Sequence, residues 1–131
     1  MTEASGEYRL LVLVVDDNAT NRLVLAKTVE LLGGQVMFAE NGAEAVESGR
    51  GGAFDLVLMD IAMPIMDGIE ATRRLRAHGV VTPIIAVTAH MAERDLPGLV
   101  ETGFNDLIEK PITVPPIAEA LDYAREFRLA S

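Results

Sequence analysis

Residues 54–68 read FDLVLMDIAMPIMDG, and this stretch changes character at Asp60. Residues 54–59 form a short apolar run, which is typical of a buried strand. The proline that follows and the pair Asp67-Gly68 indicate a loop. Asp60 therefore stands where a buried strand meets a loop, the usual position of functional side chains in an open α/β sheet. An unpaired buried carboxylate is costly, so we expect the rest of the chain to supply partners for it.

Four further apolar runs predict four more strands, because each is short and bounded by turn residues. They cover residues 10–15, 35–39, 83–87 and 105–108. Segments with helical spacing follow all five runs and begin near residues 18–20, 42, 68, 95 and 113. Strands that alternate with helices require a parallel sheet with helices on both faces. We therefore predict a doubly wound α/β fold with a five-stranded parallel sheet and five helices.

The fourth helical segment differs from the others because it contains Pro97-Gly98. Proline inside a helix removes a backbone hydrogen bond and clashes with the preceding turn. It is tolerated in the first turn. We therefore predict a late start for this helix, with Asp95 at its cap and Pro97 in its first turn, and a shortened or distorted fourth helix as the result.

Composition limits the kinds of function that are open to this chain. Its 131 residues suit one domain, which we place at residues 9–128, between a disordered lead-in (1–8) and a tail (129–131). The net charge of −9 argues against direct nucleic-acid binding. The absence of cysteine excludes disulfides and thiolate metal sites, and it fits a reducing, cytoplasmic location. No apolar run reaches the length of a membrane span, so we expect no membrane contact by this domain.

Polar side chains end the predicted strands, and the carboxyl ends of parallel strands meet at one edge of the sheet. These side chains are Asp16, Asp17, Asp60, Thr88 and Lys110. Three carboxylates at neighbouring strand ends repel one another, and a hard divalent cation relieves that repulsion. Oxygen ligands without histidine or cysteine suit Mg²⁺. A metal, a lysine and a hydroxyl are the parts of a phosphoryl-transfer site, in which Asp60 can itself be the nucleophile.

Each of these residues also has an ordinary structural explanation. Asp16 and Asp17 can cap the first helix, and Asp60 can be an ordinary loop acid. Thr88 can simply end a strand, and Lys110 can be a solvated surface lysine. Each explanation is reasonable for one residue. Five such coincidences at one edge of a sheet are not expected. The three arginines of the 68–77 segment carry no such signal, and we read them as a solvated helix face: Arg73, Arg74 and Arg76.

The chain carries four motifs that together resemble the receiver domain of two-component response regulators: VVDDN (14–18), LMDIAMPIMDG (58–68), AVTAH (86–90) and EKPI (109–112). The resemblance covers residues 10–127 and implies a flavodoxin-like fold with the strand order 2-1-3-4-5. The segments VVDDNATNR, ENGAEAV and MPIMDGIEATRRLR look most like those of receivers fused to hybrid sensor histidine kinases.

The resemblance implies a phospho-acceptor signalling domain of a phosphorelay. Asp60 would accept a phosphoryl group from a phosphohistidine on a sensor histidine kinase or a histidine phosphotransfer protein. Asp17 and Asp60 would bind Mg²⁺ directly, with the backbone carbonyl of Ala62 as the third protein ligand. Asp16 would act through a metal-bound water. The domain would assist its own phosphorylation and dephosphorylation without being an enzyme in the usual sense.

The resemblance also assigns roles to the other strand-end residues. Lys110 would pair with the phosphate, the bond to Pro111 would be cis, and Thr88 would move to hydrogen-bond the phosphate. The fourth helix, fifth strand and fifth helix would then form a surface with two states. The family usually has tyrosine or phenylalanine three residues before the lysine, where this chain has Leu107. We therefore predict a conformational response that differs from the common one.

Two other functions remain open from the sequence. A phosphohydrolase with an aspartate nucleophile commonly places a second acid two residues after the nucleophile, and this chain has Ala62 there. A degenerate receiver that acts only as a docking module would not need the five strand-end residues, all of which are present.

Overall fold

The structure, a computed structural model, describes residues 8–130. Five strands form one sheet in which all paired neighbours are parallel and the order is β2-β1-β3-β4-β5. The strands are β1 (Leu11–Val15), β2 (Gln35–Ala39), β3 (Leu56–Met59), β4 (Ile84–Thr88) and β5 (Asp106–Glu109). Both the sheet type and the strand order are as predicted.

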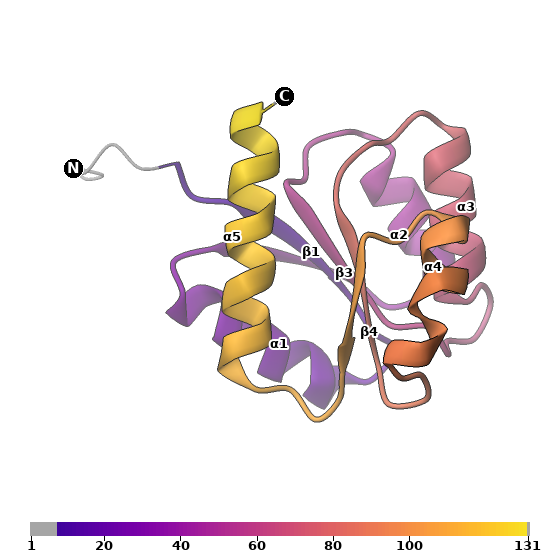
Figure 1. The fold of residues 1–131 in the computed structure, drawn as a ribbon, viewed down its shortest axis with the longest axis horizontal. Helices are drawn as coiled ribbons and strands as arrows, with labels where there is room; N and C mark the ends of the chain where they lie inside the picture. Colours follow the sequence, from indigo (N-terminus) through magenta and orange to yellow (C-terminus); the bar gives the residue numbers. More distant parts are fainter. Residues whose placement is uncertain (1–7, 131) are drawn as a thin grey trace.

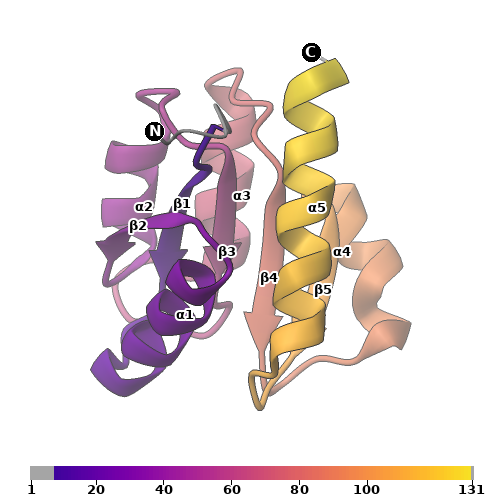
Figure 2. The ribbon, with the colours of Figure 1, turned by 90° about the vertical axis from the view of Figure 1, so that its left-hand side faces the viewer.

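Five α-helices cover the sheet on both of its faces, which confirms the doubly wound α/β fold (Figure 1). They are α1 (Ala19–Leu31), α2 (Gly42–Gly49), α3 (Gly68–Ala77), α4 (Leu96–Thr102) and α5 (Val114–Ala130). Figure 2 shows α1 and α5 together in front of one face, while α2, α3 and α4 lie behind the sheet. No helix within residues 8–130 is long and apolar enough to cross a membrane.

The core has two layers because successive side chains of a strand point to opposite faces of the sheet. On β1, Val12 and Val14 face α1 and α5, whereas Leu13 and Val15 face α2 and α3. All four of these side chains are fully buried. A strand that is buried on both faces needs a continuous apolar run, which explains why the apolar runs predicted the strands well.

The domain limits drawn from the sequence differ from the structure at the carboxyl end. Helix α5 continues through Ala130, two residues beyond the predicted limit at 128. The predicted lead-in at 1–8 lies, apart from Tyr8, outside the described residues.

Helix α4 is short, as its proline predicted. It has 7 residues with Pro97 in the first turn, and a 3₁₀ turn, Glu93–Asp95, precedes it. Asp95 stands at the N-cap position, but its carboxylate makes no capping bond to α4. The carboxylate accepts instead from the backbone N–H of Ala92 at 2.9 Å, and so closes the preceding turn.

The prediction of a solvated basic face on α3 is correct for Arg73 and Arg74 and wrong for Arg76. The guanidinium of Arg76 is partly buried and donates five hydrogen bonds. Its acceptors are the carbonyl oxygens of Val80, Thr82 and Gly103 and the side chain of Asn105. Arg76 therefore ties α3 to the end of α4 and to the chain entering β4 and β5.

We expect Arg76→Ala to lower the free energy of unfolding by about 2–4 kcal/mol, because several partly buried acceptors lose a charged donor at once. Arg74→Ala is the matched control. Arg74 is exposed and pairs with Glu70 one helical turn away at 2.8 Å, so its loss should cost about 0.5 kcal/mol or less. Urea denaturation of both variants measures the difference. Equal losses would show that the Arg76 network adds nothing to stability.

Candidate functional site

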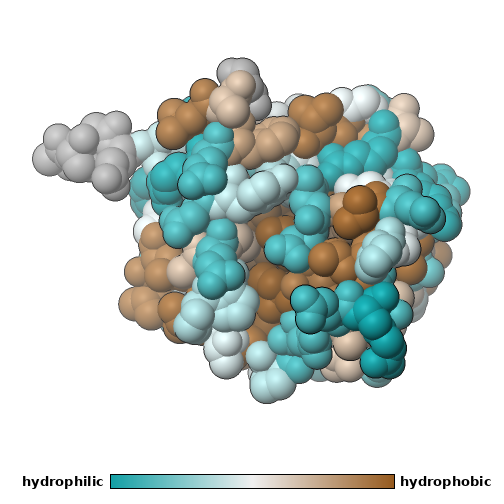
Figure 3. All heavy atoms as spheres, in the orientation of Figure 1, coloured by the Kyte–Doolittle hydropathy of each residue, from teal (hydrophilic) through white to brown (hydrophobic). Residues whose placement is uncertain are grey.

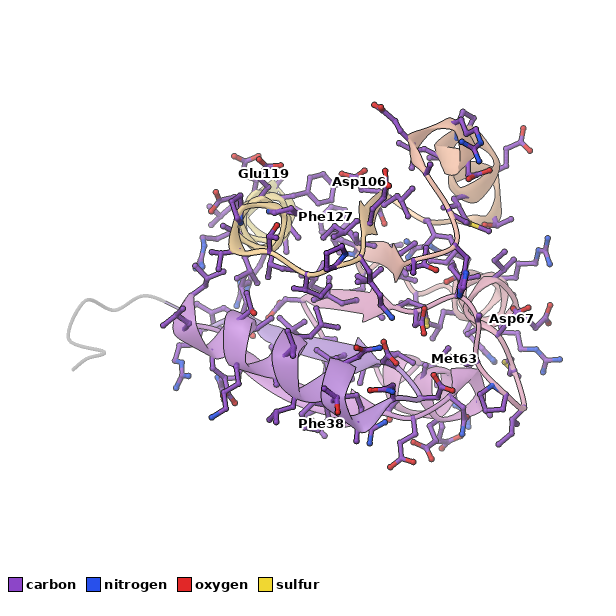
Figure 4. The ribbon with its side chains drawn as sticks, turned by 90° about the horizontal axis from the view of Figure 1, so that it is seen from below. Phe38, Met63, Asp67, Asp106, Glu119 and Phe127 are labelled. Atoms are coloured by element: carbon purple, nitrogen blue, oxygen red, sulfur yellow. The ribbon has the colours of Figure 1, made fainter. Side chains whose placement is uncertain are left out.

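The carboxyl ends of β1 and β3 bring three acids together. Asp16 and Asp17 follow β1, Asp60 follows β3, and the last residues of these strands, Val15 and Met59, are paired. One carboxylate oxygen from each acid lies within 4.8 Å of the others. Figure 4 looks onto this edge of the sheet, with Met63 and Asp67 in the loop that follows β3. The predicted convergence of the three acids is therefore present.

Asp60 is a buried carboxylate, with 6% of its surface exposed. Its Oδ1 accepts a hydrogen bond from the N–H of Ile61 at 2.8 Å. Burial and the neighbouring charge of Asp16 raise the pKa of Asp60, while Lys110 and the Ile61 N–H oppose that rise. The negative charge on Asp60 is therefore not fully compensated by the protein alone.

Lys110 is the cation of the site. Its Nζ lies 2.9 Å from Asp16 Oδ2 and 3.7 Å from Asp60 Oδ2, and its side chain is 16% exposed. The alternative of a solvated surface lysine is therefore wrong. The peptide bond between Lys110 and Pro111 is cis, the isomer that the resemblance implies.

The donor set fits a divalent cation. With all three acids ionised, one lysine leaves a charge of 1 − 3 = −2 on the cluster. The converging atoms are carboxylate oxygens, and Asp17 is exposed on the open side of the cluster. Oxygen donors of this number and charge suit Mg²⁺, which uses one or two carboxylates and keeps several waters.

The remaining predicted residues lie at the end of β4, within β5 and in the loop after β3. Thr88 ends β4 and is fully buried, with its Oγ1 accepting from the N–H of His90 at 3.2 Å. Leu107 is paired with Ala86 on β4 and packs against the core layer under α2 and α3. Ala62 is exposed in the loop after β3. Leu107 thus lies within β5, at the position where the resemblance implies tyrosine or phenylalanine.

Two glycines allow close backbone contacts at the loop after β3, one with the backbone of Asp60 and one with the start of α2. A Cβ at Gly68 would overlap the carbonyl oxygen of Asp60, so the start of α3 can pack directly under the site. The N–H of Gly42 donates to the carbonyl oxygen of Met66 at 2.9 Å, and a Cβ there would overlap that oxygen. At the tip of the loop, Ile65 has a positive φ of 72°, an unfavourable conformation for a β-branched residue.

Comparison with known proteins identifies the family. The model of the response regulator receiver domain matches residues 12–122. The chain belongs to this family. It is a receiver domain of two-component systems, and the acidic pocket at Asp16, Asp17 and Asp60 is typical of the phosphorylation and Mg²⁺ site of such domains. Phosphoryl-acceptor signalling in a phosphorelay is therefore its function class.

Receiver relatives occur both in short regulators and within long kinases. Two-component response regulator 24 of Arabidopsis thaliana is 41% identical over 117 residues, which are 88% of this chain and 84% of that protein. Sensor histidine kinase GacS of Pseudomonas protegens is 36% identical over 115 residues, which are 84% of this chain and 12% of that protein.

A solved structure of a relative contains the expected metal. The receiver domain of sensor histidine kinase PA1611 from Pseudomonas aeruginosa PAO1 has a magnesium ion coordinated in its active site cleft. It is 33% identical to this chain, with a TM-score of 0.76, and the match covers 91% of this chain and 97% of that domain.

Sequence reasoning missed one residue that shapes the site. Arg22, on the first turns of α1, donates to the backbone carbonyl oxygen of Asp16 at 2.7 Å. In the sequence, Arg22 is simply a basic residue one turn after the helix cap Asn18. Surface helices often carry such residues, so this position does not indicate a role in the site.

We expect Asp60→Asn to raise the melting temperature of metal-free protein at neutral pH by about 2–5 °C. An acid whose folded-state pKa is raised contributes stability that is present at low pH and is lost as the pH rises through that pKa. Asparagine stays neutral and can still accept from Ile61. The difference between the variant and wild type should therefore close on acidification from about pH 7.5 to about pH 4.

Thermal unfolding in a chelating buffer across that pH range measures the effect. Asp122→Asn, which neutralises an exposed acid on α5, controls for the change in net charge. A lower melting temperature for Asp60→Asn at neutral pH would contradict the expected strain on the ionised carboxylate.

Proposed function

We propose that Asp60 is the phosphoryl acceptor of this receiver, with a phosphohistidine on a sensor histidine kinase or a histidine phosphotransfer protein as the donor. The observation that carries the proposal is the placement of Asp60: a buried carboxylate with Lys110 Nζ 3.7 Å from its Oδ2 and two more acids beside it. A carboxylate oxygen attacks phosphorus, the P–N bond breaks as the P–O bond forms, and the bonding electrons return to the histidine nitrogen.

We assign the metal site to the same cluster. Asp17 and Asp60 supply carboxylate ligands, the backbone carbonyl of Ala62 supplies a third, and Asp16 acts through a water. Bound Mg²⁺ supplies positive charge against the oxygens of the transferred group. In support, the carboxylate oxygens of the three acids approach within 4.8 Å, and within residues 8–130 Lys110 is the one cation that pairs with their carboxylates.

Lys110 and Thr88 have positioning roles toward the transferred group. Lys110 already contacts both Asp16 and Asp60, so its ammonium group faces the place where a phosphoryl group on Asp60 would lie. The Thr88 hydroxyl accepts from His90 and keeps its own proton available to donate. We propose that this proton hydrogen-bonds the phosphoryl oxygen after transfer, and that the same residues assist dephosphorylation.

The side chains after β3 favour an acceptor over a phosphohydrolase. Turnover requires a general acid for the leaving group, and the position two residues beyond Asp60 is the apolar Ala62. A purely docking module is the second alternative. A docking module has no need for the buried Asp60. Because the pKa of Asp60 is raised, its ionised form lowers the folding stability at neutral pH.

We propose that the signal is passed on through the surface formed by α4, β5 and α5. A groove on this surface is lined by Leu96, Leu107, Ile108 and Pro116, with acids at its margins. Figure 3 shows apolar side chains exposed on this side of the molecule between hydrophilic ones. Leu107 is part of both the groove and the β5 strand beside β4, so its aliphatic side chain replaces an aromatic switch. We place the domain in the cytoplasm, where phosphorelay kinases present their histidines.

Intact mass after incubation with acetyl phosphate tests the acceptor chemistry. Wild type and Asp122→Asn should gain one phosphoryl group only when Mg²⁺ is present. Asp60→Asn should gain none, because its amide is not nucleophilic. Asp122 is the control because it is an exposed acid of α5, remote in sequence from the cluster.

The outcomes separate the three functions. A stable or slowly decaying adduct that needs both Mg²⁺ and Asp60 supports the phospho-acceptor. Rapid multiple turnover of acetyl phosphate would indicate a phosphohydrolase. A folded protein without any adduct under all conditions would contradict the proposal and favour the docking module.

A further inference from the structure

Arg22 contacts the backbone of Asp16, the first acid of the cluster. Its Nη1 donates to the carbonyl oxygen of Asp16 at 2.7 Å, in a partly buried position. Its Nη2 lies 3.8 Å from Glu40 Oε2, just after β2. The side chain of Arg22 is 15% exposed, whereas that of Glu40 is 65% exposed. The arginine is therefore packed into the fold, while its acidic partner stands in solvent.

We propose that Arg22 is a positioning residue that fixes the segment 16–18 so that the carboxylates of Asp16 and Asp17 are held ready for a divalent cation. This inference rests on the proposed metal site and adds to it a residue that contacts no metal. The guanidinium of Arg22 holds the carbonyl group of Asp16. The backbone fixed in this way carries the side chains of Asp16 and Asp17.

The hydrogen bonds around this segment show why such fixation matters. The N–H of Asp16 donates to the carbonyl oxygen of Ala39 at 3.2 Å, and Asp16 Oδ1 accepts from the N–H of Asn18 at 2.9 Å. Among residues 8–130, by contrast, the carboxylate of Asp17 has no hydrogen-bond or ion-pair partner. Its position is therefore set by the backbone on either side of it, and Arg22 holds that backbone at the Asp16 carbonyl.

Charge and position predict opposite effects for this residue, which makes the role testable. A cation beside an acidic cluster disfavours a second cation, so removing the charge alone would tighten Mg²⁺ binding. Removing the hydrogen bond frees the segment 16–18. Mg²⁺ binding would then have to offset the entropy cost of ordering this segment, so the affinity would fall. Glu40 partly neutralises the charge of Arg22, whereas nothing else donates to the Asp16 carbonyl among the described residues. The positional effect should therefore dominate.

Mg²⁺ titration by calorimetry tests the inference on the full chain, with Arg22→Gln and two controls. Arg50→Gln removes another arginine that pairs with a glutamate, Glu47 at 3.6 Å, on the surface. Glu40→Gln removes the acidic partner and leaves the arginine. We expect Arg22→Gln to weaken Mg²⁺ binding about 3- to 10-fold, near the lower range known for residues that orient metal ligands. Both controls should stay within about 2-fold of wild type.

Thermal unfolding with and without Mg²⁺ separates positioning from general stability. A residue that only stabilises the fold would lower the melting temperature equally in both conditions. Arg22→Gln should instead show a smaller Mg²⁺-induced rise than wild type, because that rise follows the affinity for the folded state.

The possible outcomes are distinct. Unchanged or tighter Mg²⁺ binding by Arg22→Gln, or an equal loss in Glu40→Gln, would overturn the positioning role and leave the metal site standing. Wild-type protein that binds no Mg²⁺ would overturn the metal site itself, and this inference with it.

Discussion

Repulsion among three carboxylates at one edge of a parallel sheet is the constraint on which the rest of this structure depends. The register of β1 and β3 places Val15 beside Met59, so the acids that follow these two residues lie close together. Lys110 compensates part of this charge through a 2.9 Å contact to Asp16 and a longer one of 3.7 Å to Asp60. The remaining negative charge is of the kind that a divalent cation relieves. Burial and this repulsion together raise the pKa of Asp60.

The surrounding fold is arranged to hold these charges in place. Both strands are buried on two faces, so their ends have little freedom to separate. Gly68 lets α3 approach the carbonyl of Asp60 more closely than any side chain would allow. The strain of Ile65 and the close contact at Gly42 belong to the same loop. The approach at Gly68 packs the start of α3 against the backbone of Asp60, while Asp17 remains exposed to solvent.

The features that the sequence predicted well are those governed by local pattern. Apolar runs mark strands because these strands are buried on both faces, and Pro97 marks the start of α4 because proline fits only the first turn of a helix. The acids, Thr88 and Lys110 could be placed together because each ends a strand, and parallel strands end at one edge. The strand order required the family resemblance, since alternation alone does not specify which strands are neighbours.

Two residues whose environments the sequence did not reveal are arginines with long-range acceptors. Arg76 reaches carbonyls at the entry to β4 and at the end of α4, and Arg22 reaches the carbonyl of Asp16 after β1. A carbonyl oxygen carries no side-chain signal, so no pattern of residue types distinguishes such an arginine from its solvated neighbours on the same helix.

Both arginines solve the same physical problem at opposite edges of the sheet. Chain segments that leave a parallel sheet lose their strand partners, and their backbone groups need new ones. At the edge where β4 and β5 begin, Arg76 satisfies several carbonyls at once, and there the consequence is stability. At the edge where β1 ends, the satisfied carbonyl belongs to Asp16 itself. The same kind of contact there is the one for which we propose a role in positioning the acids, so a backbone hydrogen bond that elsewhere adds stability would here act on metal binding.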